Sequence, residues 1–251
     1  MIWRGRGRRQ FRLVASALAV ACGGSAPRTE SVPQVSPVPT TRIAAEEPEP
    51  DDGVQVIASK GHMDPRAVDA GIAPHRAALT ACYTERVGRR RWLGGHALLR
   101  WEVAADGAIA RVLLVSSDLG AWPVEKCLLE MARRATFGKP IGGAAAELLL
   151  PLEFSAHGQP PLWDVEQSAQ AIGGQLTKLA ACTKGAAAPP AEVAITLYVG
   201  QRGRVESVGF ASPTTAIDDA WAACAEKTAL AWHLPDPKGQ VTKLAVRYRP
   251  R

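Results

Sequence analysis

The residues of this 251-residue chain with the most chemical potential are five cysteines and five histidines. Thiols form disulfides, bind metals or act as nucleophiles, and imidazoles bind metals or move protons. The histidines, at 62, 75, 96, 157 and 233, have no spacing typical of a metal site. The sequence also lacks a P-loop, a GxSxG elbow and an HExxH motif. We therefore expect no metal, no cofactor and no catalytic residue, and a hydrolase is the least favoured alternative.

Two of the cysteines end similar segments that lie one hundred residues apart. "LTACY" (79–83) contains Cys82, and "LAACT" (179–183) contains Cys182. Both segments follow runs rich in residues that favour helices, and Ile72 and Leu79 recur at the same offset as Ile172 and Leu179. The spacing predicts an internal repeat in which each copy begins with a helix.

The segments that follow these helices also match each other. Residues 94–118 align with 191–214 at a constant offset of 96, and in both the apolar residues alternate with a period of two, which is typical of half-buried strands. Gly107 and Gly203 supply the residue that a tight reversal favours. Each copy is therefore predicted to form a β-hairpin. A change of phase between Ile109 and Val112 predicts a bulge.

A second helix and a last strand complete each copy. Cys127 recurs as Cys224 in helix-like segments that end near Pro140 and Pro237, and an apolar strand follows each of them. Pro151 within the first of these strands indicates an edge position. We predict an α+β fold with two αββαβ units, residues 63–158 and 159–251. Each unit is expected to form a three-stranded antiparallel sheet covered by two helices.

The repeat also suggests how the cysteines pair. Four cysteines allow three pairings. Within each repeat, one cysteine ends the first helix and one lies in the second, which favours Cys82–Cys127 and Cys182–Cys224. Buried free thiols and a metal site remain as alternatives. Disulfides require an oxidising compartment, and the N-terminus is consistent with export.

The N-terminus is typical of a secretory signal. Residues 1–12 are basic, and residues 13–21 are apolar but too few to span a bilayer, which needs about twenty. "LAVACGGS" (18–25) resembles a bacterial lipobox, with Ala19 where leucine is usual. We expect residues 1–21 to be a signal peptide and Cys22 to carry a diacylglyceryl anchor. The alternative is ordinary cleavage that leaves Cys22 as a free thiol. Gly23 after the cysteine favours the outer membrane over the inner one.

The composition between this anchor and the repeats predicts a spacer. Residues 22–62 are rich in proline, serine, threonine and acidic side chains, so we expect a disordered linker tethered by lipid. The net charge of +6 falls to +1 once the five arginines of residues 1–21 are removed. This balance argues against a nucleic-acid partner.

The hairpin sequence "GHALLRWEVAADGAIARVLLVSS" (95–117) resembles the C-terminal domain of TonB-type energy transducers. The positions of the cysteines and "WHLPDP" (232–237) are closer to the AgmX/PglI variant of that domain. The resemblance covers residues 66–155 and 164–250. It implies a non-enzymatic periplasmic domain whose sheet edge accepts an extended segment of a partner.

We therefore expect an outer-membrane lipoprotein facing the periplasm that acts as an interaction scaffold, in an envelope or motility-type complex. Its partner would be an envelope protein or a cell-wall component. The alternative is a purely structural role in which the two repeats cover each other's edges.

Overall fold

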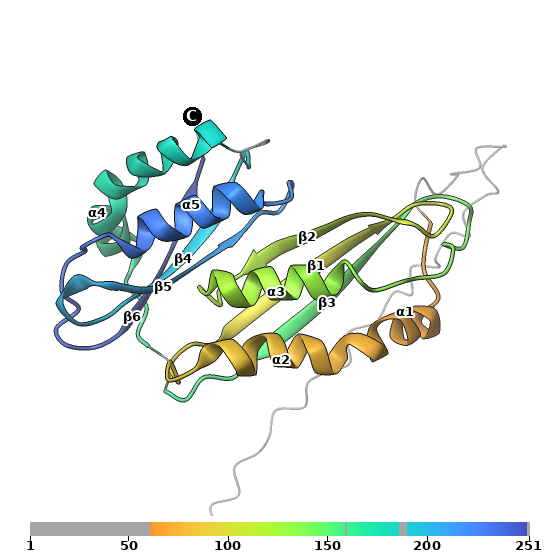
Figure 1. Cartoon of the computed structure of the whole chain (residues 1–251), viewed down its shortest axis with the longest axis horizontal. Helices are drawn as coiled ribbons and strands as arrows, with labels where there is room; N and C mark the ends of the chain where they lie inside the picture. Colours follow the sequence, from red (N-terminus) through yellow and green to blue (C-terminus); the bar gives the residue numbers. More distant parts are fainter. Residues whose placement is uncertain (1–60, 159, 186–189, 250–251) are drawn as a thin grey trace, which may run out of the picture. The chain divides into compact units, whose positions relative to one another are not determined.

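The computed structural model describes residues 61–158, 160–185 and 190–249. The signal peptide, Cys22 and the linker up to residue 60 lie outside these residues. Two three-stranded antiparallel sheets with their helices make up the described part of the chain (Figure 1). The predicted α+β class, with one sheet and its helices per repeat, is confirmed.

The first repeat has strand order β2-β1-β3, so that its last strand lies beside its first. Helices α2 and α3 lie side by side on one face of this sheet (Figure 1). Its elements are α1 (Pro65–Ile72), a 3₁₀ turn (Ala73–His75), α2 (Arg76–Val87), β1 (Gly95–Val103), β2 (Ile109–Ser117), α3 (Trp122–Ala132) and β3 (Ala146–Phe154).

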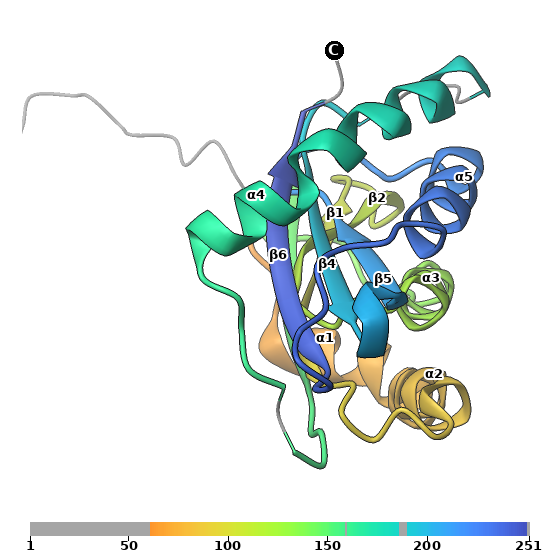
Figure 2. The same cartoon turned by 90° about the vertical axis from the view of Figure 1, so that its left-hand side faces the viewer.

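The second repeat has the equivalent strand order, β5-β4-β6. Helix α5 packs on β5, and α4 contacts β6 (Figure 2). Its elements are α4 (Val165–Leu176), a 3₁₀ segment (Thr177–Gly185), β4 (Val193–Val199), a 3₁₀ turn (Gln201–Gly203), β5 (Val205–Ala211), α5 (Asp219–Leu230) and β6 (Thr242–Tyr248).

Both hairpins contain the same bulge. In β2, Ala110 is the extra residue, because Val103 pairs with Ile109 while Glu102 pairs with Arg111. In β5 the extra residue is Glu206, which lies 96 positions later. The phase change in the sequence therefore corresponds to a real bulge. Gly203 adopts φ +72°, and a Cβ there would lie 1.7 Å from the carbonyl oxygen of Leu234, so only glycine fits this turn.

The first helix of each repeat is present as predicted but is not continuous, and Cys82 does not end it, because α2 runs past Cys82 to Val87. Asp64 and Asp164 are equivalent N-caps, and each side chain accepts a backbone N–H of the first turn. Pro74 interrupts the first helix with a 3₁₀ turn, because it has no N–H to continue the hydrogen-bond ladder. Cys182 lies in the 3₁₀ segment after α4 rather than in the α-helix.

The folded part starts slightly before the predicted boundary at residue 63. Gly61 donates its N–H to the carbonyl of Ala145 at 2.9 Å, and His62 forms a bridge with Ile141. These two residues, expected in the linker, therefore pair with the segment before β3.

The cysteines form the two disulfides that the repeat favours over the other pairings. Cys82 is bonded to Cys127 and Cys182 to Cys224, and both pairs have Cα atoms 5.5 Å apart. The first disulfide joins α2 to α3, and the second joins the 3₁₀ segment after α4 to α5. In each repeat the disulfide therefore connects the first helical segment to the second.

We predict that each disulfide stabilises its own repeat. The pairs close loops with sequence separations of 45 and 42, for which the chain-entropy estimate is about 4 kcal/mol each. The double variants C82A/C127A and C182A/C224A should each lower the free energy of unfolding by up to that amount in urea titrations.

Reductant should destabilise the wild type and have less effect on each double variant. Intact mass after alkylation without reduction should show none of these four thiols modified. Alkylation of all four in the native protein would contradict the pairing.

Candidate functional site

β3 is an edge strand of the first sheet. β3 pairs with β1 along all nine of its residues, and no backbone hydrogen bond joins its other edge to a further segment within the described part of the chain. Pro151 occupies the middle of this strand, as predicted for an edge. A proline is tolerated there when its nitrogen faces outward, because no ladder hydrogen bond is lost.

A groove runs between β3 and the first helices of the same repeat. Its volume is about 340 Å³, and its apolar lining includes Ile72, Leu79, Leu150 and Phe154. The side chains of β3 alternate, so that alternate residues from Leu148 to Phe154 turn toward the core while the others are exposed. An extended segment added to this edge would place alternate side chains in the groove.

The other outer strands are covered wholly or partly by other parts of the same chain. β2 and β5 face each other between the repeats, where the N–H of Ser212 donates to the carbonyl of Leu114 at 2.9 Å. The edge of β6 carries the segment 161–163, which pairs with Lys243 in parallel through two backbone hydrogen bonds of 3.0 Å. Strand addition is therefore best accommodated at β3.

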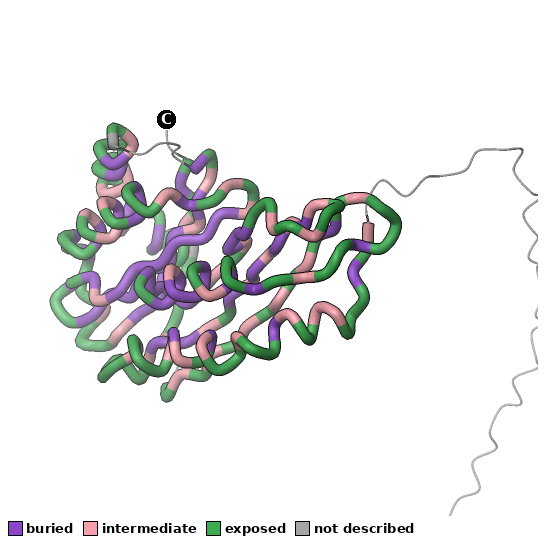
Figure 3. Tube along the Cα trace, turned by 45° about the vertical axis from the view of Figure 1, so that its right-hand side comes forward, coloured by how far each residue is buried: buried purple, intermediate pink, exposed green. Residues whose placement is uncertain are grey.

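The central strand of the second sheet, β4, is buried on both faces, whereas the central strand of the first sheet, β1, alternates between buried and partly exposed residues. The helix-facing residues of β4 are buried, but Thr196 and Tyr198 on the opposite face are buried as well. The first repeat covers that face: Tyr198 donates its hydroxyl to the carbonyl of Gly94 at 2.9 Å, and Ser207 donates to that of Gly120 at 2.6 Å. Buried residues consequently make up most of β4 and β5, and long buried stretches can be followed along the chain trace in Figure 3.

A fully buried carboxylate joins the two repeats. Glu125, in the first turn of α3, is 0% exposed. It accepts hydrogen bonds from the hydroxyl of Ser117 at 2.6 Å and from the N–H of Phe210 on β5 at 2.7 Å. It also accepts from the backbone N–H groups of Gly120 and Ala121. One side chain thus satisfies donors from both repeats.

Burial is the largest influence on the pKa of Glu125. Removal from water raises the pKa of Glu125 to about 7, although its hydrogen bonds to Ser117, Phe210, Gly120 and Ala121 oppose the shift. Gly209 makes space for the carboxylate, because a Cβ at that position would lie 2.4 Å from both of its oxygens. The equivalent residue of the second repeat is Ala222, so this contact exists only once.

A second polar cluster joins the repeats near the start of β1. Lys243 of β6 lies 3.0 Å from Asp118 and donates to the carbonyl of Gly94 at 3.4 Å. Asp118 also accepts the backbone N–H of His96. The ammonium of Lys243 lies 5.5 Å from the centre of the Tyr198 ring. These partners satisfy the buried charge, so the cluster is best explained as an inter-repeat contact.

The structure describes four of the five predicted site residues. The four domain cysteines are in disulfides, and Cys22 lies outside the described residues. In the described ranges no group of three histidine, cysteine or acidic residues is arranged to hold a metal ion. Over the same ranges, none of the helices combines the length and the apolarity that crossing a membrane requires.

Sequence reasoning missed the residues that join the repeats. Glu125, Tyr198 and Lys243 occupy positions where the other repeat has Ala222, Glu102 and Leu149. The sequence signal that could have identified them is that they differ between the two copies, because a residue required by the shared fold would be expected in both.

Comparison with known proteins adds no relative to this description. The chain matches no family model, no curated protein and no solved structure.

We predict that Glu125 makes stability depend on pH. Its pKa is raised from 4.5 to about 7 on folding, so its contribution is fully present below pH 4.5 and is lost as the pH rises through about 7. Relative to E125Q, the free energy of unfolding of the wild type should fall over this range by at most about 3 kcal/mol. Urea titrations at several pH values measure this difference.

Glu130→Gln is the matched control for that experiment, because Glu130 is an exposed carboxylate on the same helix. The control should keep the pH dependence of the wild type. A dependence of E125Q identical to that of the wild type would contradict the prediction.

We also predict that Gly209→Ala destabilises the contact between the repeats. The added methyl group would meet both oxygens of Glu125 and would lie 2.6 Å from the backbone nitrogen of Ala121. Overpacking of this kind costs about 1–3 kcal/mol.

Gly173→Ala serves as the control for this substitution, because Gly173 lies within α4 and a Cβ there meets nothing within 4 Å. Thermal unfolding should show a lower Tm for G209A and an equal or higher Tm for G173A. An unchanged Tm for G209A would place Glu125 away from β5.

Proposed function

We propose that this chain is a non-enzymatic scaffold of the bacterial cell envelope that binds an extended segment of a partner protein at the outer edge of β3. The edge and the adjacent apolar groove are the observation that carries the proposal. Backbone hydrogen bonds would supply affinity along such an edge, and the groove would select the side chains of the partner.

The proposed location follows from the N-terminal sequence. A lipid on Cys22 would hold the protein at the outer membrane, with the repeats in the periplasm. The two disulfides support an oxidising compartment such as this one. The likeness of the hairpins to TonB-type and AgmX/PglI C-terminal domains supports the same role.

A catalytic role has less support. The four cysteines of the repeats are engaged in disulfides, so none of them offers a thiolate nucleophile. The second candidate function is instead purely structural. It is favoured by the contact between β2 and β5 across the repeats, where the N–H of Ser212 donates to the carbonyl of Leu114 and each strand partly covers the other's edge.

We predict that an envelope partner cross-links to β3 and that cross-linking depends on the backbone of this strand. Leu149 is 60% exposed on β3, so a photo-reactive residue placed there in cells should capture a discrete envelope protein. Because strand geometry repeats every two residues, the backbone nitrogen of Glu153 faces the same outer edge as that of Pro151. Glu153→Pro removes an outward N–H, whereas Glu153→Ala keeps it.

The proline variant should lower the cross-linking yield about fivefold, as expected for one hydrogen bond of about 1 kcal/mol. The alanine variant should keep the yield, and a probe at Leu230, exposed on α5, should not capture the same protein. No capture at Leu149, or equal yields from both Glu153 variants, would reject strand addition and leave the structural role.

A further inference from the structure

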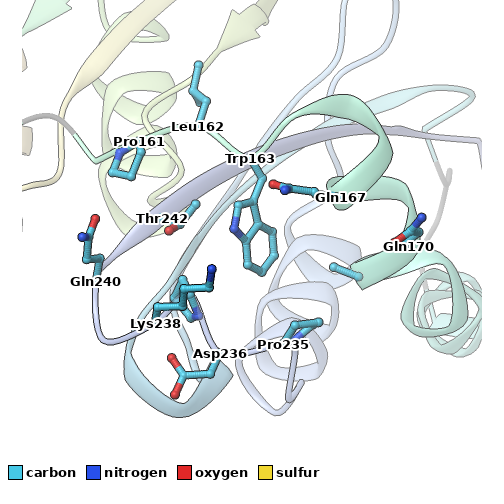
Figure 4. A pocket seen from close by; sticks show the side chains of 12 residues that line it. Pro161, Leu162, Trp163, Gln167, Gln170, Pro235, Asp236, Lys238, Gln240 and Thr242 are labelled. Atoms are coloured by element: carbon cyan, nitrogen blue, oxygen red, sulfur yellow. The ribbon is translucent and has the colours of Figure 1, made fainter.

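A groove in the second repeat lies between the start of α4, the loop after α5 and the start of β6. Its volume is about 570 Å³, within the range of about 300–1,000 Å³ that small-molecule sites occupy. The indole of Trp163 projects into it between Gln167 and the loop that carries Pro235 and Lys238 (Figure 4).

The first repeat has a groove at the equivalent place but lines it differently. Its groove has a volume of about 460 Å³ and is lined by Ala67 and Ala70, which occupy the positions of Gln167 and Gln170. At the position equivalent to Trp163 the first repeat has Met63, a buried core residue. Trp163 itself packs partly against the core. The first repeat shows that the shared fold tolerates methionine at this position and alanine at the positions of the two glutamines, so the fold does not require the indole or the two amides.

The side chains of the second groove match the chemistry of a sugar. The C–H groups on one face of a pyranose ring are apolar and pack against the electron-rich face of an indole. Sugar hydroxyls both donate and accept hydrogen bonds, and so do the amides of Gln167, Gln170 and Gln240. Asp236 and Lys238 in the lining carry opposite charges, which favours a neutral ligand.

A proline-rich segment is the other ligand typical of grooves lined by tryptophan and proline. One oxygen of the Asp236 carboxylate already accepts the backbone N–H of Gly239 at 3.2 Å. Proline has no N–H to donate, so such a segment would offer no donor to the other carboxylate oxygen or to the amide oxygens of the glutamines. The balance of donors and acceptors therefore favours the sugar.

We propose that this groove binds a neutral oligosaccharide, with one ring stacked on Trp163 and its hydroxyls held by Gln167, Gln170 and Gln240. Gln170 also donates to Glu166 at 3.3 Å, which leaves its carbonyl oxygen available as an acceptor. The site is separate from β3, so it stands whether or not that edge binds a partner.

The test uses the mature chain with neutral tetrasaccharides of glucose and of N-acetylglucosamine. Calorimetry and tryptophan fluorescence should show saturable binding of at least one of them. Trp163→Met, which installs the residue of the first repeat, should weaken binding at least about tenfold, the effect of losing one aromatic stacking contact. Trp163→Phe should weaken it less.

Gln167→Ala/Gln170→Ala installs the other two residues of the first repeat and should also weaken binding. Thr80→Ala, in the groove beside β3, should leave saccharide binding unchanged. The Tm of each variant separates lost binding from lost folding, and the cross-link at Leu149 should persist in all Trp163 variants that fold.

Three results would overturn the proposal. One is the absence of binding by every tetrasaccharide. Another is unchanged affinity in a folded Trp163→Met variant. The third is saturable binding of a hexaproline peptide at this groove in place of any saccharide.

Discussion

The burial of Glu125 between the repeats is the constraint on which the arrangement of the folded part depends. A buried carboxylate is costly unless donors surround it, and here the donors come from both repeats. The hydroxyl of Ser117 and the N–H of Phe210 meet on the same side chain. Gly209 is the residue small enough to allow that approach. Separating the repeats would leave the N–H of Phe210 without this acceptor.

This contact also makes the two repeats unequal. The segment after β2 covers the open face of the second sheet, so that β4 is buried on both sides. The central strand of the first sheet, β1, keeps the alternating burial of a strand with one more exposed face. As a result, the outer edges of β2 and β5 face each other, and the edge of β6 carries the segment 161–163. β3 retains an outer edge beside an apolar groove. A duplicated unit thus gives different surfaces in its two copies.

Residues that discourage aggregation at the edge of β3 would also affect how a partner segment binds there. Pro151 interrupts the row of outward N–H groups, and a charged side chain lies on each side of it, at Glu147 and Glu153. Such residues discourage aggregation through an edge strand. An added segment would therefore gain fewer ladder bonds than at an uninterrupted edge. The affinity of the segment would depend more on its side chains in the groove, which favours selective over non-specific binding.

The sequence by itself determined the unit of the fold. Period-two alternation, the glycine turns, the bulge and the helix cysteines all recur at fixed offsets, because they are local requirements that each copy must meet. The tertiary structure alone decided how the copies meet and which edges they cover. The residues responsible, Glu125, Tyr198 and Lys243, follow no local period. Their partners lie in the other repeat, 85 to 149 residues away, and no pattern within one repeat specifies a contact with another.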